Sequence, residues 1–488
     1  MARNSSCVKM GANENSQIDQ IFFDYELPDG WSSKNLREVV SNKKGKLPRQ
    51  LDENPWSGSI PHIDIDAFER GNVKRHSDRE SAVIVQKGDL IVVWDGARCG
   101  LVGKAPFEGS LGSTLMTLKP LQINSNYLFF ILRIYFKIIN SNPRGIGIPH
   151  VEPDIFWNLE IPLPPLAEQQ RIVVCIETLL SHINASRERL RRVPLIMKRF
   201  RQGVLAAACS GILTEEWREE QKNLESAAAL YNRIHSIRLK KYEYTATEAK
   251  RLKKRLPPKP SYLENTEPDS DATTEIPNEW IWKKVVNLGP FGEDTVKTGP
   301  FGAILKSKEF VLSGVPIIAI GNVQWGKFDL NSARVDHVTE EKALELENYR
   351  VRTGDVLFTR SGTIGRSLVV PDFADHWLMS YHLLRVRADP NLIIPQYLYF
   401  VFSGCESSKE YTSDATIGST RPGINTTILE NVPIPLPPLH EQHEIVRRVN
   451  ALFERADQIE QQVVGATKRT EALTHAVLRK AFSGELVR

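Results

Sequence analysis

Two stretches of the chain carry apolar residues at alternating steps of four and three positions, with one polar exception in each, Ser186 and Thr470. The apolar positions of the first stretch are Ile172, Ile176, Leu179, Ile183, Leu190, Val193, Met197, Phe200 and Val204. Those of the second are Ile445, Val449, Leu452, Ala456, Ile459, Val463, Ala466, Leu473 and Val477. Steps of four and three average about 3.5 residues, the period of a coiled-coil seam. The pattern predicts two long helices that bury these seams against each other, and short connections at their ends favour an antiparallel pair.

A proline run precedes each predicted helix, and the two runs are nearly identical. Residues 162–173 (PLPPLAEQQRIV) return as residues 435–446 (PLPPLHEQHEIV). Proline is excluded from helix interiors but accepted at a helix start, so each copy predicts a strand or loop that turns into a helix. A Ser-Gly pair follows each helix, and glycine is a common helix stop. Pro194 lies inside the first helix, where it predicts a kink in the preceding turn.

The segments before the two proline runs share short landmarks in the same order. Both have an apolar-Pro start to a predicted strand, at residues 60–65 and 315–320, and both have a Gly-Asp turn that leads into an apolar strand, at residues 86–93 and 352–359. The side chains at the following turns differ between the halves. The sequence therefore predicts an α+β fold with an internal pseudo-twofold repeat: two globular domains of mixed α/β type, joined by two long antiparallel coiled-coil helices.

The predicted division of the chain follows from these landmarks. Residues 1–24 form a flexible N-terminal tail, 25–161 the first globular domain and 162–213 the first long helix. Residues 276–434 form the second domain and 435–488 the second long helix. The charged segment between the halves, 214–275, predicts a helix or helical hairpin followed by a linker. Its basic run, residues 250–255 (KRLKKR), fits either a solvated charged face or a contact with phosphate.

Composition adds little to this description. The 488 residues are 41% hydrophobic and 25% charged, as in ordinary globular proteins, and a net charge of +4 permits nucleic-acid binding without arguing for it. The five cysteines are dispersed, and no histidines have metal-ligand spacing, so we expect no metal site and a reduced, cytoplasmic environment. The most apolar stretch, residues 127–139, contains Arg133 and Lys137 and is too short to span a membrane.

Catalytic motifs are absent from the sequence. It has no Gly-rich phosphate loop, no His-Glu-x-x-His, no Gly-x-Ser-x-Gly and no Asp/Asn-Pro-Pro-Tyr/Phe motif of amino-methylating enzymes. We therefore expect no catalytic residue and no cofactor in this chain.

The doubled motif carries a family resemblance. Residues 161–173 and 434–446, each followed by a long helix that ends near Ser-Gly, resemble the DNA-specificity (S) subunit of Type I restriction-modification enzymes. Residues 361–365 (SGTIG) and 420–425 (TRPGIN) are similar to stretches in the target recognition domains of that family. The first half departs from this pattern, because it has residues 147–151 (GIPHV) where the second has 420–424 (TRPGI).

The resemblance implies that each globular domain is a target recognition domain that reads one half of a bipartite, asymmetric site in double-stranded DNA. It implies that the helices set the spacer and dock two methylation (M) subunits, and that restriction (R) subunits complete the assembly. S-adenosylmethionine, ATP and Mg would then be bound by those partner subunits, and this chain would be a non-catalytic, cytoplasmic protein that reaches the nucleoid through DNA.

Candidate DNA contacts are polar residues on the expected loops, where Arg, Lys, Ser, Thr and Asn can reach phosphates or base edges. In the first domain they are Lys43, Lys44, Lys46, Arg49, Arg98, Lys104 and Arg144. In the second domain they are Lys297, Lys306, Arg360, Ser361, Thr363, Arg366, Arg421 and Asn425.

Three other interpretations stay open from the sequence. The chain could be a specificity subunit of a methylase-only complex that has no nuclease partner. It could be a coiled-coil adaptor that binds no DNA, which the paired globular domains disfavour. A methyltransferase with fused recognition domains is disfavoured by the missing catalytic motif.

Overall fold

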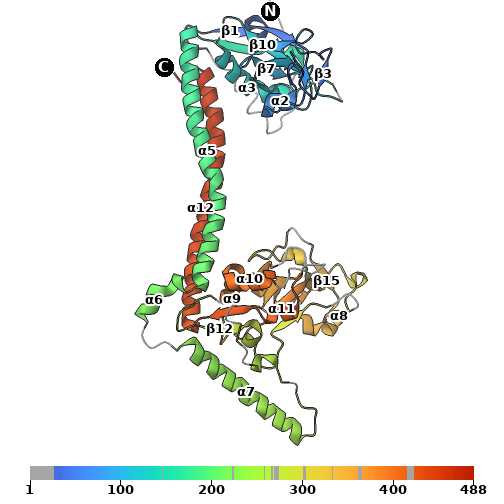
Figure 1. Cartoon of the computed structure of the whole chain (residues 1–488), viewed down its shortest axis with the longest axis vertical. Helices are drawn as coiled ribbons and strands as arrows, with labels where there is room; N and C mark the ends of the chain where they lie inside the picture. The colour runs from blue at the N-terminus through green and yellow to red at the C-terminus, as the bar shows by residue number, and fades with distance from the viewer. Residues whose placement is uncertain are drawn as a thin grey trace, which may run out of the picture. The chain divides into compact units, whose positions relative to one another are not determined.

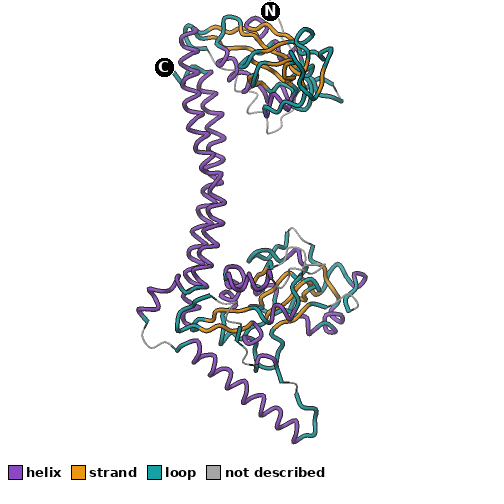
Figure 2. The backbone as a smooth tube through the Cα atoms, in the orientation of Figure 1, coloured by secondary structure: helices purple, strands orange, loops and turns teal. Residues whose placement is uncertain are grey.

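The computed structural model describes residues 27–145, 147–221, 225–257, 259–264, 267–268, 274–300, 304–331, 334–360, 365–414 and 423–487 (Figure 1). The predicted tail, residues 1–24, lies outside this part of the chain. The molecule divides into two compact units, Met1–Arg192 with Val463–Arg488, and Val193–Gln462. Each unit contains one globular domain and a section of both long helices (Figure 2). The mixed helix and sheet content of the two domains confirms the predicted α+β fold.

The globular domain of the first unit is built on a four-stranded antiparallel sheet. Its strand order is β2 (Val40–Lys44), β10 (Leu115–Pro120), β7 (Leu90–Val93) and β8 (Val102–Lys104). A second sheet has the order β3 (Leu51–Asp52), β5 (His76–Ser77), β4 (Ile60–Ile63), β9 (Gly109–Leu111) and β6 (Ile84–Val85). Helix α3 (Ser125–Ser141) buries Tyr127, Ile131 and Tyr135 in the domain core. The short helices are α1 (Leu36–Val39), α2 (Ile65–Arg70) and α4 (Pro153–Trp157).

The globular domain of the second unit repeats this plan. Its four-stranded sheet has the order β13 (Val296–Thr298), β19 (Leu383–Val386), β16 (Val356–Thr359) and β17 (Ser367–Val369), and helix α9 (Pro395–Gly404) takes the place of α3. A second sheet has the order β15 (Asp336–Val338), β14 (Val315–Ile318) and β18 (Leu378–Met379). Strands β4 and β14 confirm the two apolar-Pro strands predicted from the sequence.

The remaining helices of the second unit are short, apart from α7. They are α6 (Glu215–Glu220), α7 (Ala227–Arg251), α8 (Glu340–Glu345), α10 (Glu406–Asp414) and α11 (Thr426–Glu430). Single 3-10 turns lie at η1 (Ile212–Thr214), η2 (Ser261–Leu263), η4 (Val285–Leu288), η5 (Ser307–Glu309), η6 (Ile320–Asn322), η7 (Glu347–Tyr349) and η8 (Asp372–Ala374). No helix in the described ranges is long and apolar enough to cross a membrane.

The two long helices are α5 (Leu166–Cys209) and α12 (Leu439–Phe482), each of 44 residues. In the first unit, Arg187 of α5 donates to the Thr470 carbonyl (3.2 Å) and to Thr474 Oγ1 (2.9 Å). In the second unit, Arg201 of α5 pairs with Asp457 and with Glu460 (3.2 Å). Later residues of α5 meet earlier residues of α12, so the helices pair antiparallel, as predicted.

The predicted seam is wrong at three positions. Phe200, Ile459 and Leu473 are 38%, 42% and 51% exposed, whereas the other predicted seam residues are buried or half-buried. A straight α-helix has about 3.6 residues per turn, so a strict alternation of four and three drifts away from the contact face. The contact passes instead to the next residues, Arg201, Glu460 and Thr474, which are half-buried and take part in the interhelical bonds described above.

Both long helices stop at a glycine in the left-handed region, which confirms the predicted stops. Gly211 has φ +80° and Gly484 has φ +77°. A Cβ atom on Gly211 would overlap the ring of Pro277, and one on Gly484 would overlap the ring of Pro28. Helix α5 continues through Pro194; the bend predicted there stays a prediction.

We predict opposite stability effects for two Gly-to-Ala changes near the end of α5. Gly211→Ala should lower the free energy of unfolding by about 1–2 kcal/mol or more, because alanine is strained at positive φ and its methyl group meets Pro277. Gly203→Ala should raise it by about 0.5–1 kcal/mol, because a methyl group on this mid-helix glycine would have no other atom within 4 Å. Thermal unfolding of both variants tests this, and a Gly211→Ala protein as stable as Gly203→Ala would contradict it.

Candidate nucleic-acid interface

Each globular domain is fixed to its long helix by the same short strand pair. In the first unit, β1 (Ser32–Asn35) pairs antiparallel with β11 (Glu160–Leu163), and in the second, β12 (Ile281–Lys284) pairs with β20 (Pro433–Leu436). The proline run therefore continues a strand, and the helix begins directly after its last proline. This joint explains why the sequence around it is repeated while the domains differ.

A buried glutamine closes each joint. Gln169 is 2% exposed; its Oε1 accepts from the Asn124 amide (2.8 Å) and its Nε2 donates to the Pro164 carbonyl (2.9 Å). Gln442 is fully buried and makes the same pair of bonds, from the Ile394 amide (2.8 Å) and to the Pro437 carbonyl (2.9 Å). Asn124 and Ile394 are the N-cap residues of α3 and α9. One amide side chain therefore ties the proline strand, the long helix and the domain helix together.

The neighbouring glutamate holds a tryptophan at the start of each domain. Trp31 Nε1 donates to Glu168 (3.2 Å), and Trp280 Nε1 donates to Glu441 (2.8 Å). Glu441 is 1% exposed and also accepts from Thr214 Oγ1 (2.7 Å) and pairs with Arg218 (2.5 Å). The second joint therefore contains a buried charge network that the first joint lacks among the described residues.

A buried tyrosine completes the repeated pattern. The Tyr127 hydroxyl donates to the Pro162 carbonyl (3.0 Å), and the Tyr397 hydroxyl donates to the Pro435 carbonyl (2.7 Å). Burial raises the pKa of both phenols well above the usual range, so the hydroxyls stay protonated and can donate. Neither hydrogen bond was predicted from the sequence.

The candidate DNA contacts of the first domain lie on strand ends and turns. Lys43 and Lys44 are on β2, Lys104 ends β8, and Lys46 and Arg49 are exposed on the loop after β2. Three of the candidates already have polar partners: Lys44 pairs with Asp95 (2.9 Å), Arg98 with Glu69, and Lys104 donates to Asn126 (2.6 Å).

The structure brings Lys44 and Arg144 together around two residues that the prediction missed. Asp95 accepts from Lys44 and bonds His150 Nδ1 (2.7 Å), and His150 exchanges backbone hydrogen bonds with Arg144. Asp95 belongs to the turn after β7, and His150 to the GIPHV stretch where the first half departs from the second. The turn that contains Asp95 and the stretch that contains His150 can both be recognised in the sequence, but nothing in the sequence shows that these two residues are in contact.

In the second domain, the described candidates Arg360, Arg366 and Lys297 are half-buried, and Lys306 and Asn425 are exposed. Arg360 follows β16 and donates to Thr298 (3.4 Å), Arg366 donates to Gln324 (3.0 Å), and Lys297 on β13 pairs with Asp294 (3.3 Å). The backbone amide of Lys306 donates to Glu309 (2.6 Å). Asn425 caps α11 by accepting from the Ile428 amide (2.8 Å), which is a structural role. Ser361, Thr363 and Arg421 lie outside the described residues.

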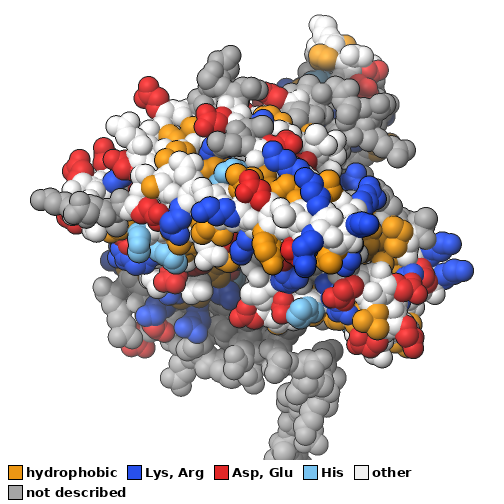
Figure 3. All heavy atoms as spheres, turned by 90° about the horizontal axis from the view of Figure 1, so that it is seen from below, with side chains coloured by type: hydrophobic (Ala, Val, Ile, Leu, Met, Phe, Trp, Pro, Cys, Tyr) orange, Lys and Arg blue, Asp and Glu red, His pale blue; other side chains and the backbone are white. Residues whose placement is uncertain are grey.

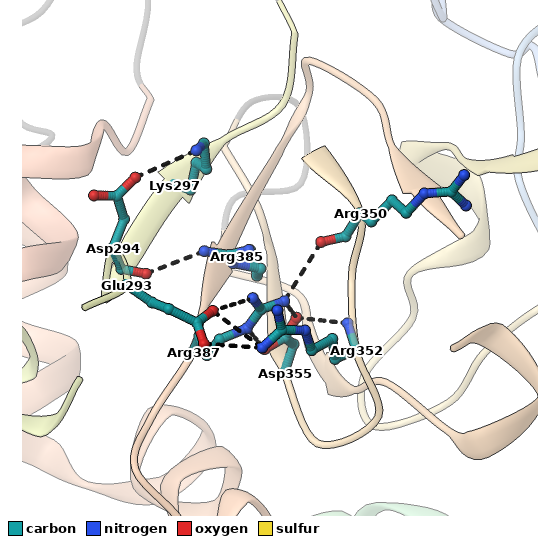
Figure 4. A network of polar contacts seen from close by, with 8 residues as sticks. All are labelled: Glu293, Asp294, Lys297, Arg350, Arg352, Asp355, Arg385 and Arg387. Carbon is teal, nitrogen blue, oxygen red and sulfur yellow. Dashed lines mark hydrogen bonds and ion pairs between the residues drawn. The ribbon is translucent and has the colours of Figure 1, made fainter. Parts of the chain in front are cut away.

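A network of charged side chains lines a cavity of about 460 Å³ in the second domain (Figure 4). Arg387 pairs with Asp355 (2.7 Å) and Glu293 (2.6 Å), and Arg352 also pairs with Glu293 (2.9 Å). Arg385 is 3% exposed and donates to the Asp294 carbonyl (3.0 Å). Burial, together with the charge of Arg387, lowers the pKa of Arg385 to about 10.

The two sheets carry different side chains at these strand positions. In the second domain, Val386 of β19 pairs with Val356, the residue after Asp355. In the first domain, Leu118 of β10 pairs with Leu90, the residue after Asp89. Positions 386 and 118 therefore correspond. This register places Thr117 of the first domain where the second has Arg385, and Lys119 where it has Arg387. The network was not predicted from the sequence, because only the strand pairing shows that residues 293, 355 and 387 meet. The same scaffold therefore carries different polar groups in the two domains.

Within the described part of the chain, no three His, Cys, Asp or Glu side chains are arranged to hold a metal ion. The chain is thus a protein of two domain-and-helix modules whose joints are alike and whose polar surfaces differ. A family model described as the Type I restriction modification DNA specificity domain matches residues 28–193 and again residues 297–464. The chain belongs to this family.

Similar proteins span nearly the whole chain. The EcoBI and EcoKI specificity subunits of Escherichia coli Type I restriction enzymes are each 28% identical to it, over 94% of this chain and 87% and 90% of their own lengths. The HsdS subunit of Thermoanaerobacter tengcongensis has a TM-score of 0.57 at 18% identity, and covers 95% of this chain and 99% of its own. A chain from a structure of a type I R-M system has a TM-score of 0.61 at 19% identity, with coverages of 94% and 100%. The solved structures share the fold.

The two joints should differ in their sensitivity to loss of the glutamate. Glu441→Ala should lower the free energy of unfolding by about 3–5 kcal/mol, because it leaves the charge of Arg218 without its buried partner and the Trp280 N–H without an acceptor. Glu168→Ala removes one hydrogen bond at a partly exposed position and should cost about 1 kcal/mol. Denaturant unfolding of both variants measures the difference, and equal losses would refute this account of the joints.

Proposed function

We propose that the chain is the non-catalytic subunit that reads a bipartite, asymmetric DNA site, with each globular domain reading one half. The observation that carries this proposal is that the two domains share one backbone scaffold but carry different polar side chains on it. The sheets have the same strand order, and the joints share the same bonds. The residue that follows the equivalent strands β7 and β16, however, is Trp94 in the first domain and Arg360 in the second. Base contacts from variable loops on a fixed scaffold give each domain its own specificity.

The paired helices are proposed to set the spacer between the half-sites. A helix of 44 residues is about 66 Å long at about 1.5 Å per residue. That length corresponds to at most about 18–19 base pairs, since a turn of about 10 base pairs spans about 34–36 Å.

The outer faces of the helices are proposed to dock two methylation (M) subunits. Apolar side chains outside the seam support this, because Val174, Leu195, Ile196 and Val464 are 53–63% exposed. S-adenosylmethionine, ATP and Mg would be bound by the methylation and restriction (R) subunits, and the flipped adenine would enter a methylation subunit.

Replacing Arg360 tests base or phosphate contact in the second domain. Arg360→Ala should weaken binding of the assembled complex to its own site by about 1–3 kcal/mol, if the guanidinium contacts a base, and should leave assembly intact.

Mapping methylated adenines in a genome that carries the wild-type genes identifies both half-sites beforehand. The half-site read by the first domain is the internal control, because its base preferences should not change. Unchanged affinity of the assembled variant would remove Arg360 from the interface, and an absence of sequence-dependent binding by the wild-type complex would overturn the proposed function.

Lengthening both helices tests their proposed role as spacer. Seven residues, which are two turns of a coiled-coil seam, would be inserted after Arg189 in α5 and after Arg469 in α12, near the facing contact of Arg187 with Thr470. The insertion adds about 10 Å, so the recognised spacer should lengthen by about three base pairs while both half-sites keep their bases. Insertion in one helix alone breaks the pairing and serves as the control. A changed half-site with an unchanged spacer would contradict the prediction.

A further inference from the structure

Helix α7 begins as part of the core of the second domain. Leu230, Tyr231 and Ile234 are buried in the same cluster as Trp280 and Val285. Ser226 caps the helix by accepting from the Ala229 amide (3.2 Å). The first two turns of α7 are therefore packed as firmly as the elements of the domain itself.

A buried arginine fixes the direction in which α7 leaves the domain. Arg238 is 2% exposed; it pairs with Asp389 (2.8 Å), donates to the Asn287 carbonyl (3.1 Å) and lies over the ring of Tyr262 (5.6 Å). These three contacts hold one side chain from three directions. Beyond this point the helix continues to Arg251, about 20 Å further at about 1.5 Å per residue.

The projecting half of α7 and the chain that returns from it, residues 240–257 and 259, form an arm. The Tyr242 hydroxyl donates to the Pro257 carbonyl (3.2 Å), which fastens the returning chain to the helix. Figure 1 shows α7 running below the second domain and away from it toward the tip. The arm thus has a defined direction, and its tip is the turn around residues 250–255.

The arm carries a large excess of positive charge. Its acidic residues are Glu243 and Glu248, and its basic residues are Lys240, Lys241, Lys250, Arg251, Lys253, Lys254, Arg255 and Lys259. Among the ion pairs of the described residues, Arg251 with Glu248 (2.8 Å) is the one that involves this basic set. Figure 3, the view from below Figure 1, shows Lys and Arg side chains interspersed with acidic and apolar ones on this face of the molecule. The tip therefore presents basic side chains whose charge the described residues leave uncompensated.

The backbone at the tip favours a functional role for these charges. The Lys254 amide donates to the Ala249 carbonyl (2.9 Å) and the Lys253 amide to the Lys250 carbonyl (3.1 Å), the two bonds of a Schellman helix stop. Lys253 occupies the left-handed position of this stop, with φ +52°, where glycine would cost less. Attraction to the helix C-terminus accounts for Lys250 and Arg251 in the last turn, but not for the four basic residues that follow.

We propose that this arm binds the phosphate backbone of duplex DNA that flanks the recognised site on the side of the second domain. The inference rests on the proposed function, because the arm can meet flanking DNA only if the second domain is bound to its half-site. Flexible lysines on an ordered projection suit phosphates, which demand charge but no base-specific geometry. The contact adds affinity without adding to the sequence that is read.

The test measures the binding of the assembled complex to two duplexes as a function of salt. Both contain the mapped site, and they carry about 5 or about 25 base pairs beyond the second half-site, so only the longer one reaches the arm. Replacing Lys250, Lys253, Lys254 and Arg255 together by Gln should weaken binding to the long duplex about ten- to hundredfold at about 0.1 M salt. The dependence of log affinity on log salt should fall by about 0.9 for each lost phosphate contact. On the short duplex, the variant and the wild type should bind equally.

Two single variants separate DNA contact from a structural role. Lys253→Gly suits the left-handed position better than lysine, so a purely structural role predicts an equal or higher melting temperature and unchanged binding. DNA contact predicts weaker binding to the long duplex despite that stability. Glu243→Lys adds charge at an exposed position of the same helix and should strengthen binding to the long duplex.

Three results would overturn the proposal: equal binding of the fourfold variant and the wild type to the long duplex, an equal loss on both duplexes, or a loss of subunit assembly, which would make the arm a protein-docking element. Each leaves the proposed function standing if the wild-type complex still prefers the mapped site over a duplex with scrambled half-sites. Failure of the wild type to show that preference would reject the proposed function itself.

Discussion

The amide side chain of one buried glutamine per module is the constraint on which the rest of the structure depends. A strand rich in proline offers carbonyl groups but few N–H groups, and the N-terminus of the domain helix offers N–H groups without intrahelical acceptors. Where these two ends meet away from water, each unpaired group would cost about 1–3 kcal/mol. Gln169 and Gln442 each donate to a carbonyl of the proline strand and accept from an amide at the start of the domain helix. The strand, the domain helix and the long helix are therefore held at one point.

With the joint fixed, the domains are free to differ elsewhere. The four-stranded sheets keep the same order, while a buried threonine at position 117 corresponds to an arginine at position 385 that belongs to a charged network. Such a network depends on its partners being present together, because Asp355, which is 3% exposed, has its ion pair among the described residues with Arg387 and would be a buried carboxylate without it. The contrast explains why the first domain, built on the same backbone, has no corresponding network among its described residues.

The parts that the sequence predicted well are those where a local pattern decides the structure. Strands β4 and β14, the glycine stops and the two long helices follow from residues close together in the chain. The seam drifted at Phe200 and Leu473 because a small error in period accumulates over many turns. The cluster of Lys44, Asp95 and His150 and the network of Arg387 could not be predicted, because each depends on the pairing of strands and loops far apart in sequence. Neither spacing nor composition carries that information.

The end of α12 gives the first domain an unusual order of assembly during synthesis. Leu478, Ala481 and Phe482 belong to the core of that domain, and the Phe482 ring lies 5.2 Å from Tyr127, about 350 residues earlier in the chain. The ribosome delivers these residues after the second domain, so the apolar surface around Tyr127 stays uncovered while the entire second domain is made and folds. The first domain to leave the ribosome is therefore the last to complete its core, and a chain that stops short of residue 478 leaves that core open.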